Sequence, residues 1–254
     1  MNIIAIIPGR MASSRFPGKP LAKILGKTML YHVYHRSKLS RVLNDVYIAT
    51  CDKEIEGECR MAGMKVIMTK DTHERASDRA AEAMLKIEKE TGRKIDIIAM
   101  IQGDEPMLIP EMIDAALAPL LNDKDILVSN CMSEIRSEEE FADPNTIKVV
   151  VDENAFALYF SREPIPTLKR GGKGIPMFKQ VCVIPFKRVF LITFNAMAQG
   201  PLEKAESIDM LRVLEHGFKV KMVLTNHTTY SVDTLDDLKR VEKCMADDPL
   251  VKSY

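Results

Sequence analysis

The stretch IIAIIPGRMASSRFPGKP (residues 3–20) decides the fold prediction, because an apolar run leads directly into a loop of glycine, proline, serine and basic residues. The five apolar residues from Ile3 to Ile7 predict a strand that is buried on both faces. In open α/β sheets, ligands bind beyond the carboxyl ends of such strands. We therefore expect the loop from Pro8 to Pro20 to face a ligand.

Short apolar runs of the same kind recur along the chain, at residues 45–50, 65–68, 95–101, 126–128 and 147–151. Helical patterns over residues 29–40, 53–62 and 76–90 separate the first four strands. This repetition predicts an α/β fold with a mainly parallel, doubly wound, Rossmann-like sheet. Further on, the sequence predicts an apolar strand at 181–186, helices at 187–198 and 203–216, strands at 219–224 and 228–232, and a final helix from about Thr234.

Length and composition narrow the class of protein. A chain of 254 residues is expected to form a single domain, 1–254, with a dimerisation or lid insertion around residues 155–200, where a Pro- and Gly-rich loop lies. Its 36 basic and 36 acidic residues balance, so no global field attracts nucleic acid or a membrane surface. The five cysteines lack zinc or disulfide spacing, and no apolar run approaches the roughly 20 residues of a membrane span. We expect a soluble, cytoplasmic protein.

The first loop combines flexible glycines, hydroxyl groups and cations, all of which suit a polyphosphate. These groups are Gly9, Gly18, Ser13, Ser14, Arg10, Arg15 and Lys19. The loop is not a P-loop, because Ser13 stands where the first glycine belongs and Pro20 where serine or threonine belongs. A GxGxxG motif is also absent, and a loop of merely solvated charges stays open as an alternative.

Two acidic positions follow predicted strands. Asp104 and Glu105 lie in IQGDEP (residues 101–106), and Asp233 follows the strand-like residues 228–232. Carboxylates and phosphate oxygens are the ligands that Mg²⁺ prefers. Each acid alone could also be a turn former or a helix N-cap, so it is their combination with the basic loop that predicts a magnesium–triphosphate site.

Five stretches carry a resemblance to a known family: IIPGRMASSRFPGKPL, IQGDEP, DPNTIKVVVDENAFALYFSREPIP, LRVLEHG and VDTLDDL. Together they resemble the cytidylyltransferases that activate 3-deoxy-manno-octulosonate (Kdo), the acid sugar of the lipopolysaccharide inner core, and the similarity runs along essentially the whole chain. The resemblance implies a Rossmann-like, glycosyltransferase-A-like nucleotidyltransferase fold and a homodimer. It also implies transfer of CMP from CTP to an acidic sugar, with Mg²⁺ as cofactor and pyrophosphate as product.

The resemblance assigns roles by position. It implies that the nucleotide is bound by Pro8, Gly9, Arg10, Ser13, Arg15, Lys19, Ser77, Arg79 and Gln102. Lys19, Arg10 and Asp104 would be catalytic, and Asp104 and Asp233 would hold the metal. No general base is evident in the sequence.

Three segments depart from the family pattern where the acceptor is expected. In THERASDR (residues 72–79), Arg75, Ala76 and Ser77 replace Ser-Gly-Thr; the usual His-x-Gly-x-Tyr is absent after Lys179; and Asp209 and Met210 stand for Glu-Gln. The expected acceptor-binding residues are therefore Arg75, Arg79, Gln102, Gln180, Asp209 and Met210. The resemblance implies Kdo or a related acid as the acceptor, whereas these changes favour a different acid, such as a modified octulosonate, a nonulosonate or a phosphonate.

Two other interpretations of the function stay open. The basic loop Lys169–Lys173 could suit a sugar phosphate, which would indicate a nucleotidyltransferase that uses UTP or GTP. The second interpretation is a binding protein without catalytic activity. Such a protein would have no need for a metal–phosphate site made of Lys19, Asp104 and Asp233. His32 and His35 lack ligand spacing and are expected to be packing or surface residues.

Overall fold

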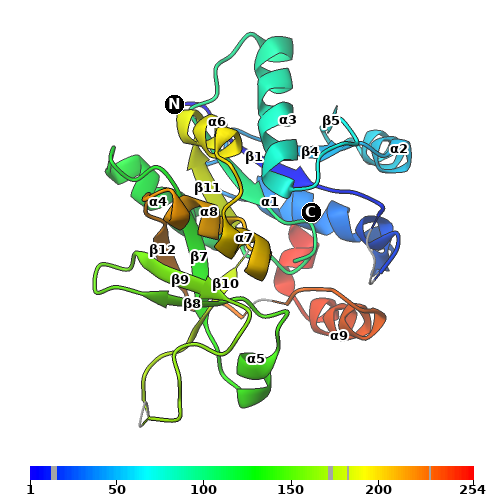
Figure 1. Cartoon of the computed structure of the whole chain (residues 1–254). Helices are drawn as coiled ribbons and strands as arrows, with labels where there is room; N and C mark the ends of the chain where they lie inside the picture. Colours follow the sequence, from blue (N-terminus) through cyan, green and yellow to red (C-terminus); the bar gives the residue numbers. More distant parts are fainter. Residues whose placement is uncertain (13–15, 171–173, 182, 229) are drawn as a thin grey trace. The chain divides into compact units, whose positions relative to one another are not determined.

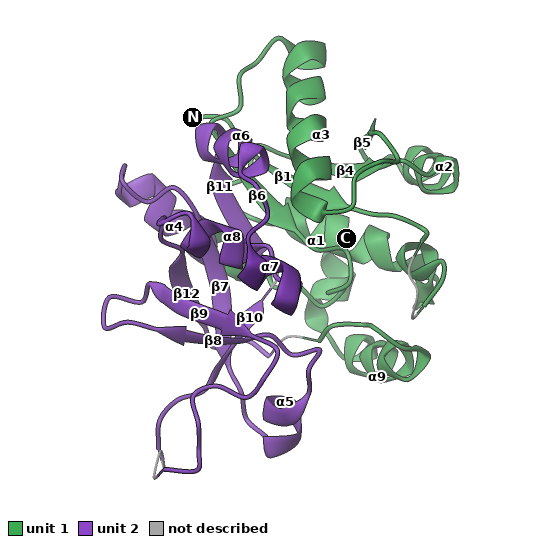
Figure 2. Ribbon diagram, in the orientation of Figure 1, with its two compact units in different colours: residues 1–114, 229–254 green, residues 115–228 purple. Residues whose placement is uncertain are grey.

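The computed structural model describes residues 1–12, 16–170, 174–181, 183–228 and 230–254. The chain forms two compact units, shown in Figures 1 and 2: residues 1–114 with 229–254 make unit 1, and residues 115–228 make unit 2. Whether they act as a single domain, and whether residues 155–200 serve as a lid or a dimer contact, stays a prediction. Among the described residues, no helix is long and apolar enough to cross a membrane.

Unit 1 contains the predicted parallel sheet. Its strands are β1 (Ile3–Pro8), β4 (Asp45–Thr50), β5 (Val66–Met68) and β6 (Ile97–Ile101), which pair in the order β6-β1-β4-β5, all parallel. Residues 3–7 of β1 are buried, as the apolar run predicts. Three helices accompany the sheet, α1 (Met29–Lys38), α2 (Lys53–Met61) and α3 (Ala76–Thr91), within two residues of their predicted bounds. The α/β fold class is confirmed.

Smaller elements of unit 1 follow β1 and end the chain. After β1 come η1 (Lys19–Leu21), β2 (Lys23–Ile24) and β3 (Lys27–Thr28). The predicted final helix is α9 (Leu235–Ala246), whose N-cap Thr234 forms a capping box with Asp237, and η2 (Pro249–Ser253) follows it. The strand expected at 228–232 is wrong: its described residues form no strand, and Val232 donates one backbone hydrogen bond to Asp104 instead of joining a ladder.

Unit 2 is built on a second, mostly antiparallel sheet that the strand–helix repetition did not predict. Its strands are β7 (Ser129–Glu134), β8 (Lys148–Val151), β9 (Ala157–Ser161), β10 (Phe178–Val181) and β12 (Lys221–Thr225). They pair in the order β12-β7-β10-β8-β9, with β12 and β7 the parallel pair. The strand predicted at 126–128 begins three residues later, because the buried polar residues Ser129 and Asn130 belong to β7 and bond to backbone carbonyls.

The remaining elements are β11 (Val183–Lys187) and the helices α4 (Pro110–Asn122), α5 (Glu138–Ala142), α6 (Arg188–Ala196), α7 (Pro201–Glu206) and α8 (Met210–Glu215). Helix α4 was not predicted. The single helix expected over 203–216 is wrong, since Ser207 adopts a left-handed conformation (φ 54°) and separates α7 from α8.

Candidate functional site

Three predicted site residues of unit 1 come together although they are far apart in sequence. The ammonium of Lys19 lies 3.0 Å from Asp104 Oδ2 and 3.2 Å from Asp233 Oδ1. The side chains are partly open to solvent, with exposed fractions of 14% for Lys19, 24% for Asp104 and 26% for Asp233. The cluster is therefore within reach of a ligand from solution.

Asp104 is positioned by the end of β6. The preceding residue, Gly103, packs so closely that a Cβ there would lie 2.9 Å from Leu30 Cδ2 and 3.4 Å from the carbonyl oxygen of Pro8. The carbonyl of Asp104 accepts a hydrogen bond from the amide of Val232, 2.9 Å away. Because Asp233 comes next in the chain, this backbone bond brings the two acids together.

Lys19 is positioned by the tight end of the first loop. Gly18 has φ +74°, and its amide donates to the carbonyl of Met11 at 3.1 Å. The amide of Lys19 donates to the carbonyl of Phe16. Lys19 thus begins a short 3₁₀ helix, and backbone hydrogen bonds hold both Gly18 and Lys19.

An apolar cluster underlies the site. Its buried members are Ile24, Met29, Val232, Val241 and Met245, with Phe16, Ala22, Met107, Tyr230, Leu238 and Val251 packed against them. These residues come from the segments that carry Lys19, Asp104 and Asp233, and from α1, α9 and η2. The segments that carry the three polar side chains therefore share one apolar cluster.

Opposite charges meet in this cluster, one ammonium with two carboxylates. Burial opposes the positive charge of Lys19, but the carboxylates of Asp104 and Asp233 outweigh burial and raise the pKa of the amine. Lys19 is thus charged at neutral pH. Its ammonium pairs with two carboxylates, and a phosphate oxygen can replace either carboxylate as its partner.

The donor set fits a divalent cation. Two carboxylates that both lie close to one ammonium form an oxygen pair of the kind that Mg²⁺ accepts together with water and phosphate. Among the described residues, no group of three or more His, Cys, Asp or Glu side chains forms a complete protein cage. The remaining ligands would then come from substrate and solvent.

The other predicted residues of the first loop are only partly described. Ser13 and Arg15 lie outside the described residues. Arg10 is exposed, Pro8 is half-buried, and Gly9 is buried with its amide donating to the carbonyl of Ala49 at 2.9 Å. Their nucleotide-binding roles stay predictions.

The loop between β5 and α3, residues 69–75, is called the second loop, and the first turns of α3 hold it in place. Arg79 is 3% exposed and donates to the hydroxyl of Thr69 and the carbonyl of Lys70, while Ser77 is fully buried. Arg75 is half-buried at the N-cap of α3, and Gln102 is half-buried just after β6. Arg79 therefore serves here to hold the loop, and any contact of these residues with a substrate stays a prediction.

Glu82 on α3 was missed by the sequence analysis. It accepts hydrogen bonds from the amide of Lys70 and from His73, and it pairs with Lys86 at 2.8 Å. Burial raises its pKa, but these partners outweigh burial and lower the pKa to about 2. The spacing of Glu82 and Lys86, four residues apart on one helix face, was the available signal.

The other three predicted acceptor residues belong to unit 2. Gln180 donates from its amide to Asn130 at 2.6 Å. Asp209 immediately precedes α8, and Met210 is 1% exposed, packed as a core residue of its unit. Their acceptor role stays a prediction.

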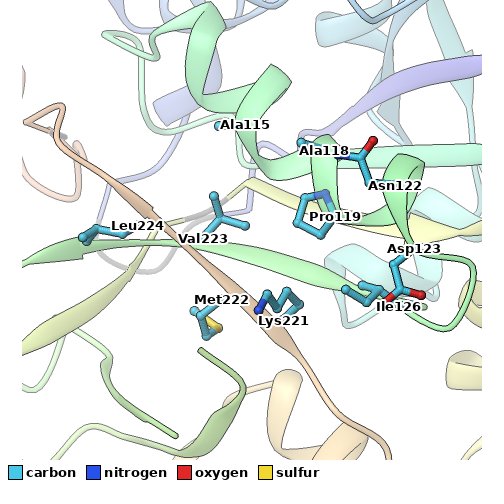
Figure 3. Close-up of a pocket in the computed structure, with 10 residues that line it drawn as sticks. All are labelled: Ala115, Ala118, Pro119, Asn122, Asp123, Ile126, Lys221, Met222, Val223 and Leu224. Carbon is cyan, nitrogen blue, oxygen red and sulfur yellow. The ribbon is translucent and has the colours of Figure 1, made fainter. Parts of the chain in front are cut away.

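Unit 2 also has an open groove between α4 and β12, with a volume of about 510 Å³, shown in Figure 3. It is lined by Ala115, Ala118, Pro119, Asn122, Asp123, Ile126, Lys221, Met222, Val223 and Leu224. None of the predicted site residues lines it. The chemistry-bearing cluster of unit 1 is therefore the candidate active site.

Comparison with known proteins identifies the family. The model of the cytidylyltransferase family matches residues 4–223. A curated protein from Geobacter metallireducens, named 3-deoxy-manno-octulosonate cytidylyltransferase, is 42% identical over 95% of this chain and 96% of its own length. The chain belongs to the 3-deoxy-manno-octulosonate cytidylyltransferase family. The mitochondrial member from Arabidopsis thaliana is 38% identical over 96% of this chain and 83% of its own length.

Solved structures agree with this membership. The structure of CMP:2-keto-3-deoxy-manno-octonic acid synthetase complexed with CTP superposes with a TM-score of 0.89 at 35% identity, covering 97% of this chain and 99% of that one. A 4-diphosphocytidyl-2C-methyl-D-erythritol synthase from Anaerococcus prevotii shares the fold alone, with a TM-score of 0.63 at 11% identity over 96% of both chains. The nucleotidyltransferase fold expected for the family is thus confirmed, and the chain is a cytidylyltransferase by descent.

Proposed function

We propose that this chain transfers CMP from CTP to the anomeric hydroxyl of Kdo and releases pyrophosphate. The observation that carries the proposal is the cluster of Lys19 with Asp104 and Asp233, in which each carboxylate lies within 3.2 Å of the same ammonium. Support comes from curated relatives about 40% identical over nearly the whole chain, and from the related synthetase bound to CTP.

The reaction exchanges one bond to phosphorus for another. A bond forms between the anomeric oxygen of Kdo and the α-phosphorus of CTP, and the bond from that phosphorus to the oxygen bridging the β-phosphate breaks. Pyrophosphate leaves with the electron pair, and the proton of the sugar hydroxyl passes to solvent. Negative charge grows on the leaving oxygens, so a fixed cation near them lowers the barrier.

Lys19 supplies that cation. Its raised pKa keeps the amine charged at neutral pH, and its position at the tight end of the first loop limits the backbone movement needed to reach a triphosphate. Removing a single such donor in an enzyme of this kind costs about 10²–10³ in kcat. We infer that Lys19 donates to a phosphate oxygen of CTP.

Asp104 and Asp233 would hold Mg²⁺. When bound, the ion supplies positive charge to the phosphate oxygens of the nucleotide. The two acids contribute partly exposed carboxylate oxygens whose backbones are joined by the bond from Val232 to Asp104. This backbone hydrogen bond holds the two acidic residues together, so the chain need not rearrange for both carboxylates to bind one ion.

A related acid is the second candidate acceptor. The motivating residues are Arg75, Gln180 and Met210, where the sequence departs from the family pattern. Gln180 presents an amide that donates to Asn130, and Met210 is an apolar residue packed at 1% exposure. A site that loses a hydrogen-bonding side chain discriminates differently between hydroxylated acids.

Pyrophosphate release from CTP with Mg²⁺ tests the proposal, using Kdo beside a panel of acidic sugars and with UTP and GTP in place of CTP. We expect release that requires both CTP and Kdo, and its loss in Lys19→Met and Asp104→Asn. Lys23→Met, an exposed lysine in the neighbouring strand β2, is the matched control and keeps the wild-type rate. Better turnover of another acid than Kdo would favour the second candidate, and turnover with UTP or GTP but not CTP would reject both.

A further inference from the structure

One buried face of α1 carries two polar side chains that the proposed chemistry does not use. His32 and Arg36 lie one helical turn apart and are 1% and 0% exposed. Burying a guanidinium and an imidazole is costly unless each finds partners. The hydrogen-bond partners of His32 and Arg36 show which segments of the chain these two residues connect.

A directed chain of hydrogen bonds runs through them. Arg36 Nε lies 2.9 Å from the hydroxyl of Tyr254, which lies 3.0 Å from His32 Nδ1, and His32 Nε2 lies 2.9 Å from the carbonyl oxygen of Ile24. A guanidinium can only donate and a carbonyl can only accept, so the directions of the first and the last bond are fixed. Arg36 donates to Tyr254, and His32 donates from Nε2 to Ile24.

When the imidazole is neutral, its Nδ1 accepts from the hydroxyl of Tyr254, so the middle bond takes the same direction as the other two. Burial lowers the pKa of His32, with the positive charge of Arg36 acting in the same direction. The ring of Tyr254 also stacks on His35, with centroids 6.0 Å apart and planes at 11°. Tyr254 is thus fixed in both position and direction.

The hydrogen bonds of His32 and Arg36 reach each of the three segments that carry the candidate site. Ile24 lies in β2, directly after the turn that begins at Lys19. Arg36 Nη1 donates to the carbonyl of Leu108, four residues after Asp104, at 3.3 Å. Arg36 Nη2 pairs with Asp248, which follows α9, the helix that begins just after Asp233.

We propose that His32, Arg36 and Tyr254 form a positioning relay that fixes Lys19, Asp104 and Asp233 relative to one another for CTP binding. The three residues reach the site segments through Ile24, Leu108 and Asp248. The inference rests on the proposed use of CTP by this site. It adds positioning residues to a site whose ligand-contacting residues come from other segments.

The apolar cluster beneath the site does not perform the same task. Val241 and Met245 pack by contact, which resists separation but allows small slides, whereas hydrogen bonds have preferred directions. Loss of the relay is therefore expected to loosen ligand binding more than folding, since a shift of about 1 Å at a catalytic group can cost about 10²-fold. Loss of apolar volume is expected to do the opposite.

The decisive experiment is a double-mutant cycle read by calorimetric CTP binding in the presence of Mg²⁺. Tyr254→Phe removes one hydroxyl and keeps the ring. We expect its Kd for CTP to rise about tenfold in the wild-type background and by a clearly smaller factor in a Lys19→Met background, because one of the three groups that the relay positions is then absent. Steady-state kinetics should show the same rise in KM for CTP.

Matched variants separate positioning from folding. Tyr47→Phe removes another tyrosine hydroxyl from unit 1, one that donates to Asp45 at 3.1 Å, and is expected to leave CTP binding unchanged. Val241→Ala should lower the Tm more than Tyr254→Phe does, with an unchanged Kd. If Tyr254→Phe does not fold, His32→Gln, which can still donate to Ile24, replaces it.

Equal weakening by Tyr254→Phe in both backgrounds, or no weakening at all, would overturn the relay. Absence of CTP binding by the wild-type chain would instead overturn the proposed function. The two failures are therefore distinguishable.

Discussion

At the scale of single residues, the account depends on Lys19. Its ammonium lies within 3.2 Å of both Asp104 and Asp233, and burial makes that charge more effective than it would be in water. Methionine keeps the length and apolar stem of the lysine and removes the charge. We predict that Lys19→Met lowers kcat for pyrophosphate release by about 10²–10³-fold, with a Tm close to that of the wild type.

A fall of less than tenfold in initial rates at saturating CTP and acceptor would contradict this role for Lys19. Lys23→Met, which replaces an exposed lysine in the neighbouring strand β2, controls for the loss of a positive charge from this surface.

The same contacts predict an effect on metal binding without nucleotide. In the free protein the ammonium of Lys19 and a divalent cation would compete for the same two carboxylates, Asp104 and Asp233. Removing the ammonium leaves the carboxylates uncompensated, which favours a cation. We predict that Lys19→Met binds Mn²⁺ about tenfold more tightly than the wild type when CTP is absent.

Calorimetry or paramagnetic titration without nucleotide measures this affinity. Weaker binding by the variant would mean that the lysine and the metal do not compete. Asp104→Asn, which removes one carboxylate, should bind Mn²⁺ more weakly than either protein.

The sequence was sufficient to predict that Lys19, Asp104 and Asp233 lie together. Because carboxyl ends of parallel strands share one edge, the loop after β1 and the acid after β6 could be placed together without a structure. Asp233 could not be placed so simply, since it follows no strand and reaches the site through the bond from Val232 to Asp104. Arg36 and Tyr254 were missed because nothing in a linear pattern pairs a helix residue with one 218 positions away.

At the scale of elements, close packing of α1 against β1 and β6 supports the site. A Cβ at Gly103 would lie 2.9 Å from Leu30 Cδ2, and Leu30 is 1% exposed, so it has little room to move. We predict that Gly103→Ala lowers the free energy of unfolding by about 1–3 kcal/mol, as overpacking commonly does.

Denaturant unfolding measures the effect of Gly103→Ala. Gly57 in α2 has no atom within 4 Å of its Cβ position, so Gly57→Ala is the matched control and should be neutral or stabilising. If Gly103→Ala were as stable as Gly57→Ala, the close approach of Leu30 would not constrain the end of β6.

The anchoring of the second loop to α3 predicts a pH dependence. The pKa of Glu82 is lowered to about 2 from its ordinary value of 4.5, so its stabilising effect is complete above pH 4.5 and is lost as pH falls from 4.5 toward 2. We predict that Glu82→Gln costs about 1 kcal/mol at pH 7, because solvent screens the ion pair with Lys86.

Urea unfolding between pH 2 and pH 7 tests this, with the exposed Glu90→Gln on the same helix as control. Identical pH profiles for the wild type and Glu82→Gln would show that Glu82 does not anchor the loop.

Element boundaries show where sequence patterns fail. The start of α9 and the four strands of the parallel sheet could be predicted because helix caps and apolar runs are local signals. The helix predicted over 203–216 failed because apolar spacing continues across the break, while Ser207 adopts a left-handed conformation. In unit 2, buried polar residues such as Ser129 and Asn130 interrupt the apolar run and conceal the start of β7.

At the scale of the whole molecule, the balanced charge of the chain leaves recognition to local sites. The family resemblance predicts a homodimer. We therefore predict a solution mass of twice the chain mass of 28.6 kDa by light scattering at the enzyme concentration used for assay. A mass equal to one chain under those conditions would reject the dimer.

The identity of the acceptor is a separate prediction. Of the predicted acceptor residues, Arg75, Arg79 and Gln102 belong to unit 1, and Gln180, Asp209 and Met210 belong to unit 2. Family membership favours Kdo, whereas the departures at Arg75, Gln180 and Met210 favour a change of acid. A comparison of kcat/KM across acids weighs one against the other.

The most direct test of the central claim is pyrophosphate release by the wild type and Lys19→Met, with CTP, Mg²⁺ and Kdo. The account predicts rapid, Kdo-dependent release by the wild type and a loss of about 10²-fold or more in the variant. Absence of Kdo-dependent release by the folded wild type, or an equal rate in Lys19→Met, would contradict it.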